Sequence, residues 1–134
     1  VKDLENAIEY YQSLGMGPFV PNPSESAADR KIYGKPAPNV KVKGVVAQMG
    51  PIKFELMQPI EGESLQKEFL KSKGEGINHI GFVVDDLEGE MAKLEEKGFK
   101  VISGGKIPPN GGFAYFDTDK LGGVIFALEL IKKR

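Results

Sequence analysis

Two segments of the chain carry apolar residues at helical spacing. Asp3 and Asp86 stand at their starts, where an aspartate suits the helix N-cap, and Gly15 and Gly98 follow them, where glycine suits the left-handed residue after the last turn. We therefore predict a helix in each segment. Their apolar stripes repeat at i, i+4 and i+7 and consist of Leu4, Ile8 and Tyr11 in the first and Leu87, Met91 and Leu94 in the second.

The two helical segments belong to an internal repeat. The sequence Val-Lys-Asp-Leu-Glu at residues 1–5 returns as Val-Asp-Asp-Leu-Glu at residues 84–88, and the same offset relates Gly15 to Gly98. A second echo relates residues 50–56 to residues 122–128 at a shorter offset. The first half therefore carries an insertion, which we place at residues 21–41, where prolines and small polar residues predict a long loop.

Runs of branched and aromatic residues predict the strands, and residues 64–72 predict a short helix that ends at Gly74. Each half then consists of a strand, a helix and three strands, except that the first half lacks its opening strand. We expect the natural sequence to continue upstream of Val1 with a strand of about six residues. The predicted strands are 18–20, 42–49, 52–58, 77–84, 100–103, 112–117 and 124–131.

The predicted fold class is α+β, with two paired βαβββ modules in a single domain over residues 1–134. Module 1 spans residues 1–60, a connecting helix lies within residues 61–75, and module 2 spans residues 76–134.

The composition excludes several kinds of functional site. The absence of cysteine excludes disulfides, thiolate zinc sites and cysteine nucleophiles, and His79 is the one histidine. The 18 basic and 19 acidic residues are interspersed, which provides no basic field for nucleic acid or an anionic membrane. No apolar run is long enough to span a bilayer. We expect a cytoplasmic protein that binds a small molecule, and neither nucleic acid nor a membrane.

His79 and Glu55 are the residues best suited to bind a metal. Strand alternation places His79 on one face with Gly81 and Val83. Glu55 lies within an apolar strand, where an unpaired carboxylate is costly and needs a cation or a donor. Imidazole and carboxylate together suit divalent zinc, nickel, cobalt, manganese or iron. A simpler interpretation of His79, a buried histidine that makes one hydrogen bond, stays open.

Glu129 is a further candidate site residue. The repeat relates Glu55 to Ala127, which cannot bind a metal, and Glu129 follows two residues later on the same strand face. The alternative for Glu129 is a solvated carboxylate near the end of the last strand. Tyr115 could offer a phenol to a substrate, although an aromatic residue in such a strand is more often part of the core.

Together these features resemble the vicinal oxygen chelate superfamily, which includes glyoxalase I, bleomycin resistance proteins and extradiol dioxygenases. The resemblance rests on the paired modules and on the sequences at residues 1–5, 54–56, 76–82 and 122–126, and it covers essentially the whole chain. The sequences at residues 61–64, 69–70 and 74–79 are most similar to the methylmalonyl-CoA epimerase-like branch.

The resemblance implies that each module curls into an open cup of sheet and that a divalent metal binds between the cups, with Glu55 and His79 as ligands. The first-strand ligand would precede Val1. The family's fourth ligand, a glutamate that also moves protons, falls on Ala127, and a second carboxylate base of the epimerases falls near Ala47. The base would then be Glu129, a bound water or a group on the substrate.

The function implied is a metal-dependent, glyoxalase-like lyase or isomerase that stabilises an enolate or enediolate of a small oxygenated or thioester substrate. Lactoylglutathione lyase and methylmalonyl-CoA epimerase are the enzymes it is expected to resemble. Two alternatives stay open, a ligand-binding protein of the bleomycin resistance type and an extradiol-type dioxygenase, which would need two histidines and one carboxylate on iron. The resemblance also implies a homodimer.

Overall fold

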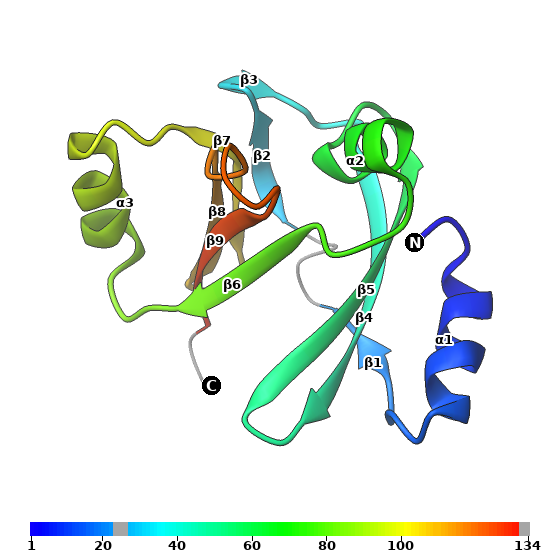
Figure 1. The fold of residues 1–134 in the computed structure, drawn as a ribbon. Helices are drawn as coiled ribbons and strands as arrows, with labels where there is room; N and C mark the ends of the chain where they lie inside the picture. The colour runs from blue at the N-terminus through cyan, green and yellow to red at the C-terminus, as the bar shows by residue number, and fades with distance from the viewer. Residues whose placement is uncertain (23–26, 132–134) are drawn as a thin grey trace. The chain divides into compact units, whose positions relative to one another are not determined.

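The computed structural model describes residues 1–22 and 27–131. The chain divides into two compact units, Val1–Glu25 with Asn39–Gly76 and Ser26–Pro38 with Ile77–Arg134. Helices and open β-sheets make up both units, as Figure 1 shows, so the predicted α+β fold class is confirmed.

The first unit is a three-stranded antiparallel sheet with two helices. Its elements are α1 (Leu4–Ser13), β1 (Val20–Pro21), β4 (Lys41–Met49), β5 (Ile52–Glu61) and α2 (Leu65–Lys73), and the strand order is β1-β4-β5. A tight turn at Gly50 and Pro51 joins β4 to β5 and fixes their register. α1 covers one face of this sheet, where the Tyr11 and Phe54 ring centroids lie 4.9 Å apart.

The second unit is a six-stranded sheet with one helix against it. Its elements are β2 (Ala28–Ile32), β3 (Lys35–Pro36), β6 (His79–Val83), α3 (Leu87–Glu96), β7 (Val101–Ile107), β8 (Gly111–Phe116) and β9 (Ile125–Leu130). The strand order is β3-β2-β7-β8-β9-β6, and only the β6–β9 pair is parallel among the described strands. The apolar stripe of α3 covers one face of this sheet, packing against Ala114, Phe116 and Leu128.

The predicted caps of α1 and α3 are confirmed. The Asn6 N–H donates to Asp3 Oδ1 and the Gly89 N–H to Asp86 Oδ1, both at 3.0 Å. Gly15 and Gly98 follow the two helices with φ of 87° and 90°, a left-handed conformation that favours glycine. The same residue types therefore mark the start and the end of a helix in each unit.

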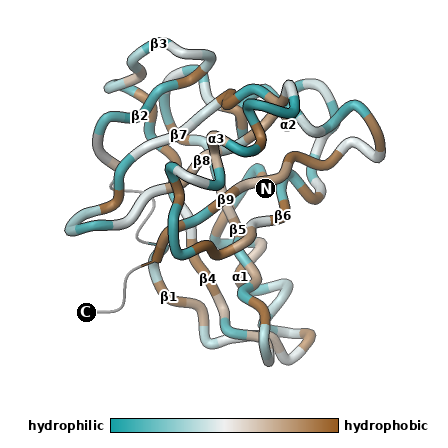
Figure 2. The backbone as a smooth tube through the Cα atoms, turned by 90° about the vertical axis from the view of Figure 1, so that its left-hand side faces the viewer, coloured by the Kyte–Doolittle hydropathy of each residue, from teal (hydrophilic) through white to brown (hydrophobic). Residues whose placement is uncertain are grey.

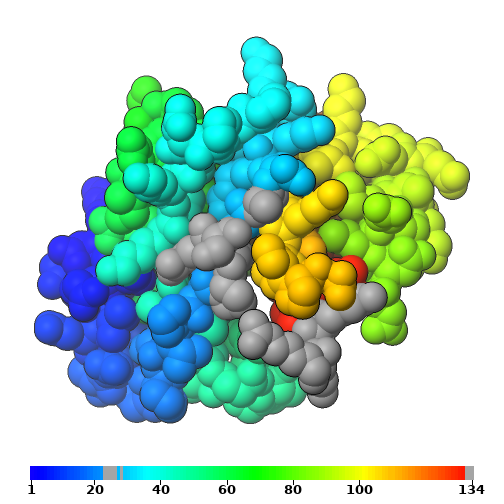
Figure 3. Space-filling view, turned by 180° about the vertical axis from the view of Figure 1, so that it is seen from behind, coloured from blue at the N-terminus to red at the C-terminus, as the bar shows by residue number. Residues whose placement is uncertain are grey.

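The prediction of a long loop over residues 21–41 is wrong in part, because β2 and β3 lie within it; residues 23–26 lie outside the described residues. Tyr33 and Gly34, both at positive φ, form the two-residue turn of a hairpin that pairs Ile32 with Lys35. Pro36 suited a loop by composition, yet it lies in an edge strand, which tolerates proline. Figure 3 shows this hairpin, in blue to cyan, beside β7 in yellow to orange.

The other strand predictions are confirmed with shifted ends. The strand expected at 18–20 is Val20–Pro21, and the strand expected at 100–103 continues to Ile107. Glycine weakens an isolated strand, but here β2 and β8 pair with β7 on both sides, and the strand continues through Gly104 and Gly105. The predicted helix at 64–72 is confirmed as α2, capped by Ser64.

Hydropathy alternates along the elements instead of forming long apolar blocks, as the brown and teal segments of Figure 2 show. Among the described residues, no helix is long and apolar enough to cross a membrane.

Replacing the N-cap residue of α3 tests whether its side chain stabilises the helix. Asp86→Ala removes the acceptor for the Gly89 N–H, and we expect a loss of about 1 kcal/mol in the free energy of unfolding, measured by urea denaturation. The matched control is Asp85→Ala, which removes the same charge from the exposed neighbouring position and should change stability by less than about 0.5 kcal/mol. Equal losses in the two variants would contradict the assignment of the cap.

Candidate functional site

The face of the second sheet opposite α3 brings together His79, Glu129 and Tyr115. Cross-strand partners point to the same face of a sheet, and Ala127 of β9 pairs with both Tyr115 of β8 and Gly81 of β6. Glu129 follows Ala127 by two residues and His79 precedes Gly81 by two, so both side chains emerge on this face. Sequence alternation alone predicted the faces of His79 and Glu129 correctly, and the strand order adds Tyr115.

His79 lies against the ring of Tyr115. The two ring centroids are 4.8 Å apart with an interplanar angle of 32°, although β9 separates their strands. On β9 the fully buried Ala127 is the partner of Tyr115, and Ile125 is the partner of His79. The His79 Nδ1 atom also lies 3.1 Å from Asn78 Oδ1. His79 is half-buried and contacts both Asn78 and Tyr115, and the simpler interpretation of a histidine that makes one hydrogen bond stays open.

Asn78 adds a donor beside His79. Its Nδ2 atom is buried and has no hydrogen-bond partner within the part of the chain that the structure describes. Buried amide groups are normally paired, and this one is an exception.

Glu129 turns its carboxylate toward the edge strand β6. A Cβ atom added at Gly81 would lie 3.2 Å from Glu129 Oε1, which shows that the carboxylate occupies the space above this glycine. Positions two apart on a strand are about 6.6 Å apart, so the carboxylate lies near His79 on the same face. Glu129 is half-buried, and the alternative of a solvated carboxylate near the end of the last strand stays open.

Arg30 is a site residue that sequence reasoning missed. It lies on β2, and its Cζ atom is 5.6 Å from the centroid of the Phe113 ring. Burial lowers the pKa of Arg30, and the nearby Tyr115 acts in the opposite direction. The one feature of the sequence that could have pointed to Arg30 is its residue type. Arg30 and Arg134 are the two arginines of a chain whose other basic side chains, apart from His79, are lysines.

Glu55 lies in the first unit, on the face of β5 that is opposite α1. It pairs with Val46, whereas its neighbour Phe54 points to the α1 side and pairs with Ala47. Ala47 is therefore buried beneath α1 and does not lie on the face of Glu55. Glu55 is half-buried, and its repeat partner Ala127 also lies on the face opposite the helix of its own unit.

The described residues do not form a complete metal site by themselves. Within residues 1–22 and 27–131, no three His, Cys, Asp or Glu side chains are grouped to hold a metal ion. The second unit offers His79 and Glu129 on one face, and Ala127 stands where the resemblance implied a glutamate ligand. The donor types suit a divalent metal, but their number falls short of three. Metal binding by Glu55 and His79 stays a prediction.

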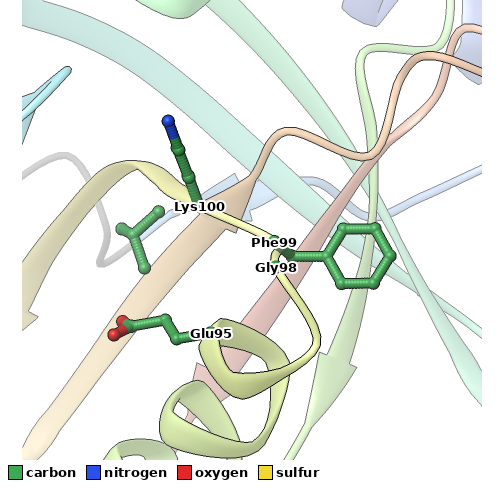
Figure 4. Close-up of a pocket in the computed structure, with 5 residues that line it drawn as sticks. Glu95, Gly98, Phe99 and Lys100 are labelled. Carbon is green, nitrogen blue, oxygen red and sulfur yellow. The ribbon is translucent and has the colours of Figure 1, made fainter.

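A pocket lies elsewhere, at the end of α3. Figure 4 shows Phe99 extending to the opposite side of the backbone from Glu95 and Lys100. Val101, which also lines the pocket, packs against the core on the α3 side of the sheet. This pocket therefore does not belong to the face that carries His79. Its lining residues are Glu95, Gly98, Phe99, Lys100 and Val101.

A family model described as "Glyoxalase/Bleomycin resistance protein/Dioxygenase superfamily" matches residues 1–116. The chain belongs to this superfamily. The match confirms the resemblance found in the sequence and includes all of β6, α3, β7 and β8.

Relatives within the superfamily include epimerases. The chain is 30% identical over 132 residues to the mitochondrial methylmalonyl-CoA epimerase of Bos taurus, covering 96% of this chain and 69% of the relative. It is 28% identical over 92 residues to the uncharacterized protein YqjC of Bacillus subtilis, covering 66% of this chain and 64% of the relative. A solved structure of a Streptomyces coelicolor methylmalonyl-CoA epimerase variant with 2-nitronate-propionyl-CoA has a TM-score of 0.74 at 18% identity, covering 98% of this chain and 91% of that chain.

The buried position of Ala127 generates a prediction. Ala127→Glu places a carboxylate at a fully buried position beside Tyr115, and we expect it to lower the free energy of unfolding by about 3 kcal/mol or more in urea denaturation. The matched control is Ala92→Glu on the exposed surface of α3, which should cost less than about 0.5 kcal/mol. Equal stability of the two variants would contradict the burial of Ala127.

Proposed function

We propose that the protein is an epimerase-type isomerase that removes and returns the proton on the carbon between the carbonyl and the carboxylate of a malonyl-type thioester. The epimerase relatives support the reaction type. The observation that carries the proposal is the carboxylate of Glu129 above Gly81, near His79 on one sheet face. The chemistry requires a base of this type within reach of a C–H bond.

Glu129 is the proposed base. In the forward step the C–H bond breaks, the proton passes to the carboxylate of Glu129, and the electron pair of the bond delocalises into the thioester carbonyl to form an enolate. The negative charge on the enolate oxygen needs hydrogen-bond donors. The imidazole of His79 is suited to this role. To invert the carbon centre, a second acid, such as a bound water, delivers a proton to the opposite side of the planar enolate, and Glu129 then releases its proton to solvent.

Two further expectations accompany this proposal. We retain Glu55 and His79 as candidate ligands of a divalent metal, which would act as a Lewis acid toward the thioester carbonyl when bound. The homodimer and the cytoplasmic location stay predictions that rest on the sequence.

A ligand-binding protein without catalysis is the second candidate. The small side chain of Ala127 favours it, because the carboxylate that the resemblance implied at this position is absent. Proton exchange distinguishes the two candidates, since a binding protein would hold the thioester without exchanging its proton.

Replacing Glu129 tests the proposed base. We expect the wild-type protein to catalyse deuterium incorporation from D₂O at C2 of methylmalonyl-CoA, followed by ¹H NMR. Glu129→Gln keeps the shape but removes the base, and should slow the exchange by about 10²- to 10⁴-fold. The control Glu95→Gln, an exposed carboxylate of α3, should exchange at the wild-type rate. Wild-type exchange that is no faster than the spontaneous rate, or that survives Glu129→Gln, would overturn the proposal.

Metal binding is tested separately. We expect Co²⁺, Ni²⁺ or Zn²⁺ to bind the protein in isothermal titration calorimetry and to raise its Tm, because binding to the folded state stabilises it. Glu55→Gln and His79→Gln should each weaken binding at least about 10-fold by analogy with losses of supporting ligands, and Glu96→Gln on the exposed surface of α3 should not. No binding in the wild type, or equal binding in all variants, would refute these ligands.

A further inference from the structure

Arg30 lies next to an irregularity in β2 and, by alternation from Ile32, on the face that carries Glu129. Ala28 pairs with Lys106 and Lys31 pairs with Gly104, so Asp29 and Arg30 together lie opposite the single residue Gly105. Asp29 has a φ of 53°, a left-handed conformation that aspartate tolerates. Such bulges are common next to active sites.

Gly105 leaves room for the guanidinium of Arg30. This glycine pairs with Phe113 of β8 and has no side chain on either face of β7. Arg30 reaches across it, and its Cζ atom lies 5.6 Å from the centroid of the Phe113 ring. The Phe113 ring in turn lies 5.4 Å from that of Tyr115, between centroids. A half-buried cation therefore lies over one aromatic ring, that of Phe113, on the site face.

Arg30 and Glu129 flank the same residue. Phe113 pairs with Glu129 on β9, and neighbouring strands lie about 4.8 Å apart. The face thus presents a guanidinium on one side of Phe113 and a carboxylate on the other. By contrast Lys31, the next residue on β2, is exposed.

We propose that Arg30 binds the carboxylate of the substrate and thereby selects carboxylated over plain acyl thioesters. A guanidinium presents paired N–H donors that match both oxygens of a carboxylate, and its weak hydration suits a half-buried position. In a malonyl-type group the carboxylate is bonded directly to the carbon that loses its proton. Arg30 would therefore position this carbon between itself and Glu129. The identity of the substrate rests on the proposed function, whereas the preference for a carboxylate can be measured by binding alone.

The experiment compares two ligands that differ by one carboxylate. Affinities of methylmalonyl-CoA and propionyl-CoA are measured by isothermal titration calorimetry for the wild type, Arg30→Gln, Arg30→Lys and the control Lys31→Gln. We expect Arg30→Gln to weaken methylmalonyl-CoA binding by about 10- to 100-fold and to leave propionyl-CoA binding within about 2-fold. Arg30→Lys keeps the charge but loses the paired donors, so its loss should be intermediate. Lys31→Gln should bind both ligands like the wild type.

The outcomes separate this inference from the proposed function. Arg30 is not the carboxylate-binding residue if Arg30→Gln weakens both ligands equally, weakens neither, or behaves like Lys31→Gln. That result, with deuterium exchange intact in the wild type, overturns the inference alone. Selective loss of methylmalonyl-CoA binding in Arg30→Gln, with no exchange in the wild type, supports the inference and overturns the isomerase proposal. A wild type that binds neither ligand contradicts both. Should Arg30→Gln fail to fold, as judged by circular dichroism, Arg30→Lys decides the question.

Discussion

The candidate site depends on small residues at three positions of the second sheet. Gly105 has no side chain where Arg30 reaches toward Phe113, Ala127 has only a methyl group beside Tyr115, and Gly81 provides the space that the Glu129 carboxylate occupies. In each case a long or aromatic side chain lies over a small residue of a neighbouring strand. A larger residue at any of the three positions would displace its neighbour, because packed interiors leave no room for additional atoms.

In each unit one helix, α1 or α3, covers one face of the sheet, and the candidate site residues lie on the opposite face. α1 contacts Phe54 in the first unit, and α3 contacts Ala114, Phe116 and Leu128 in the second. Strand alternation then places Glu55 in one unit and Glu129 in the other on the face opposite the helix. The repeat in the sequence is thus a repeat of packing as well. The two units differ chemically at one equivalent position, where the first has Glu55 and the second has Ala127.

Much of this arrangement could be predicted from the sequence, because its causes are local. Asp3 and Asp86 at the N-caps, Gly15 and Gly98 after the helices, and strand alternation around His79 each act within a few residues. What could not be predicted depends on which strands become neighbours. The contact of His79 with Tyr115 spans three strands, and the role of Arg30 depends on the pairing of β2 with β7. β2 lies in a segment whose prolines and small polar residues predicted a loop, so composition alone did not reveal this strand.

The most direct test is a crystal structure of the protein with methylmalonyl-CoA. We expect the substrate carboxylate to contact the guanidinium of Arg30, and C2 to lie about 3 to 3.5 Å from a carboxylate oxygen of Glu129, the separation of reacting atoms in a near-attack geometry. An acyl group bound away from the face formed by β8, β9 and β6, with neither residue in contact, would contradict it.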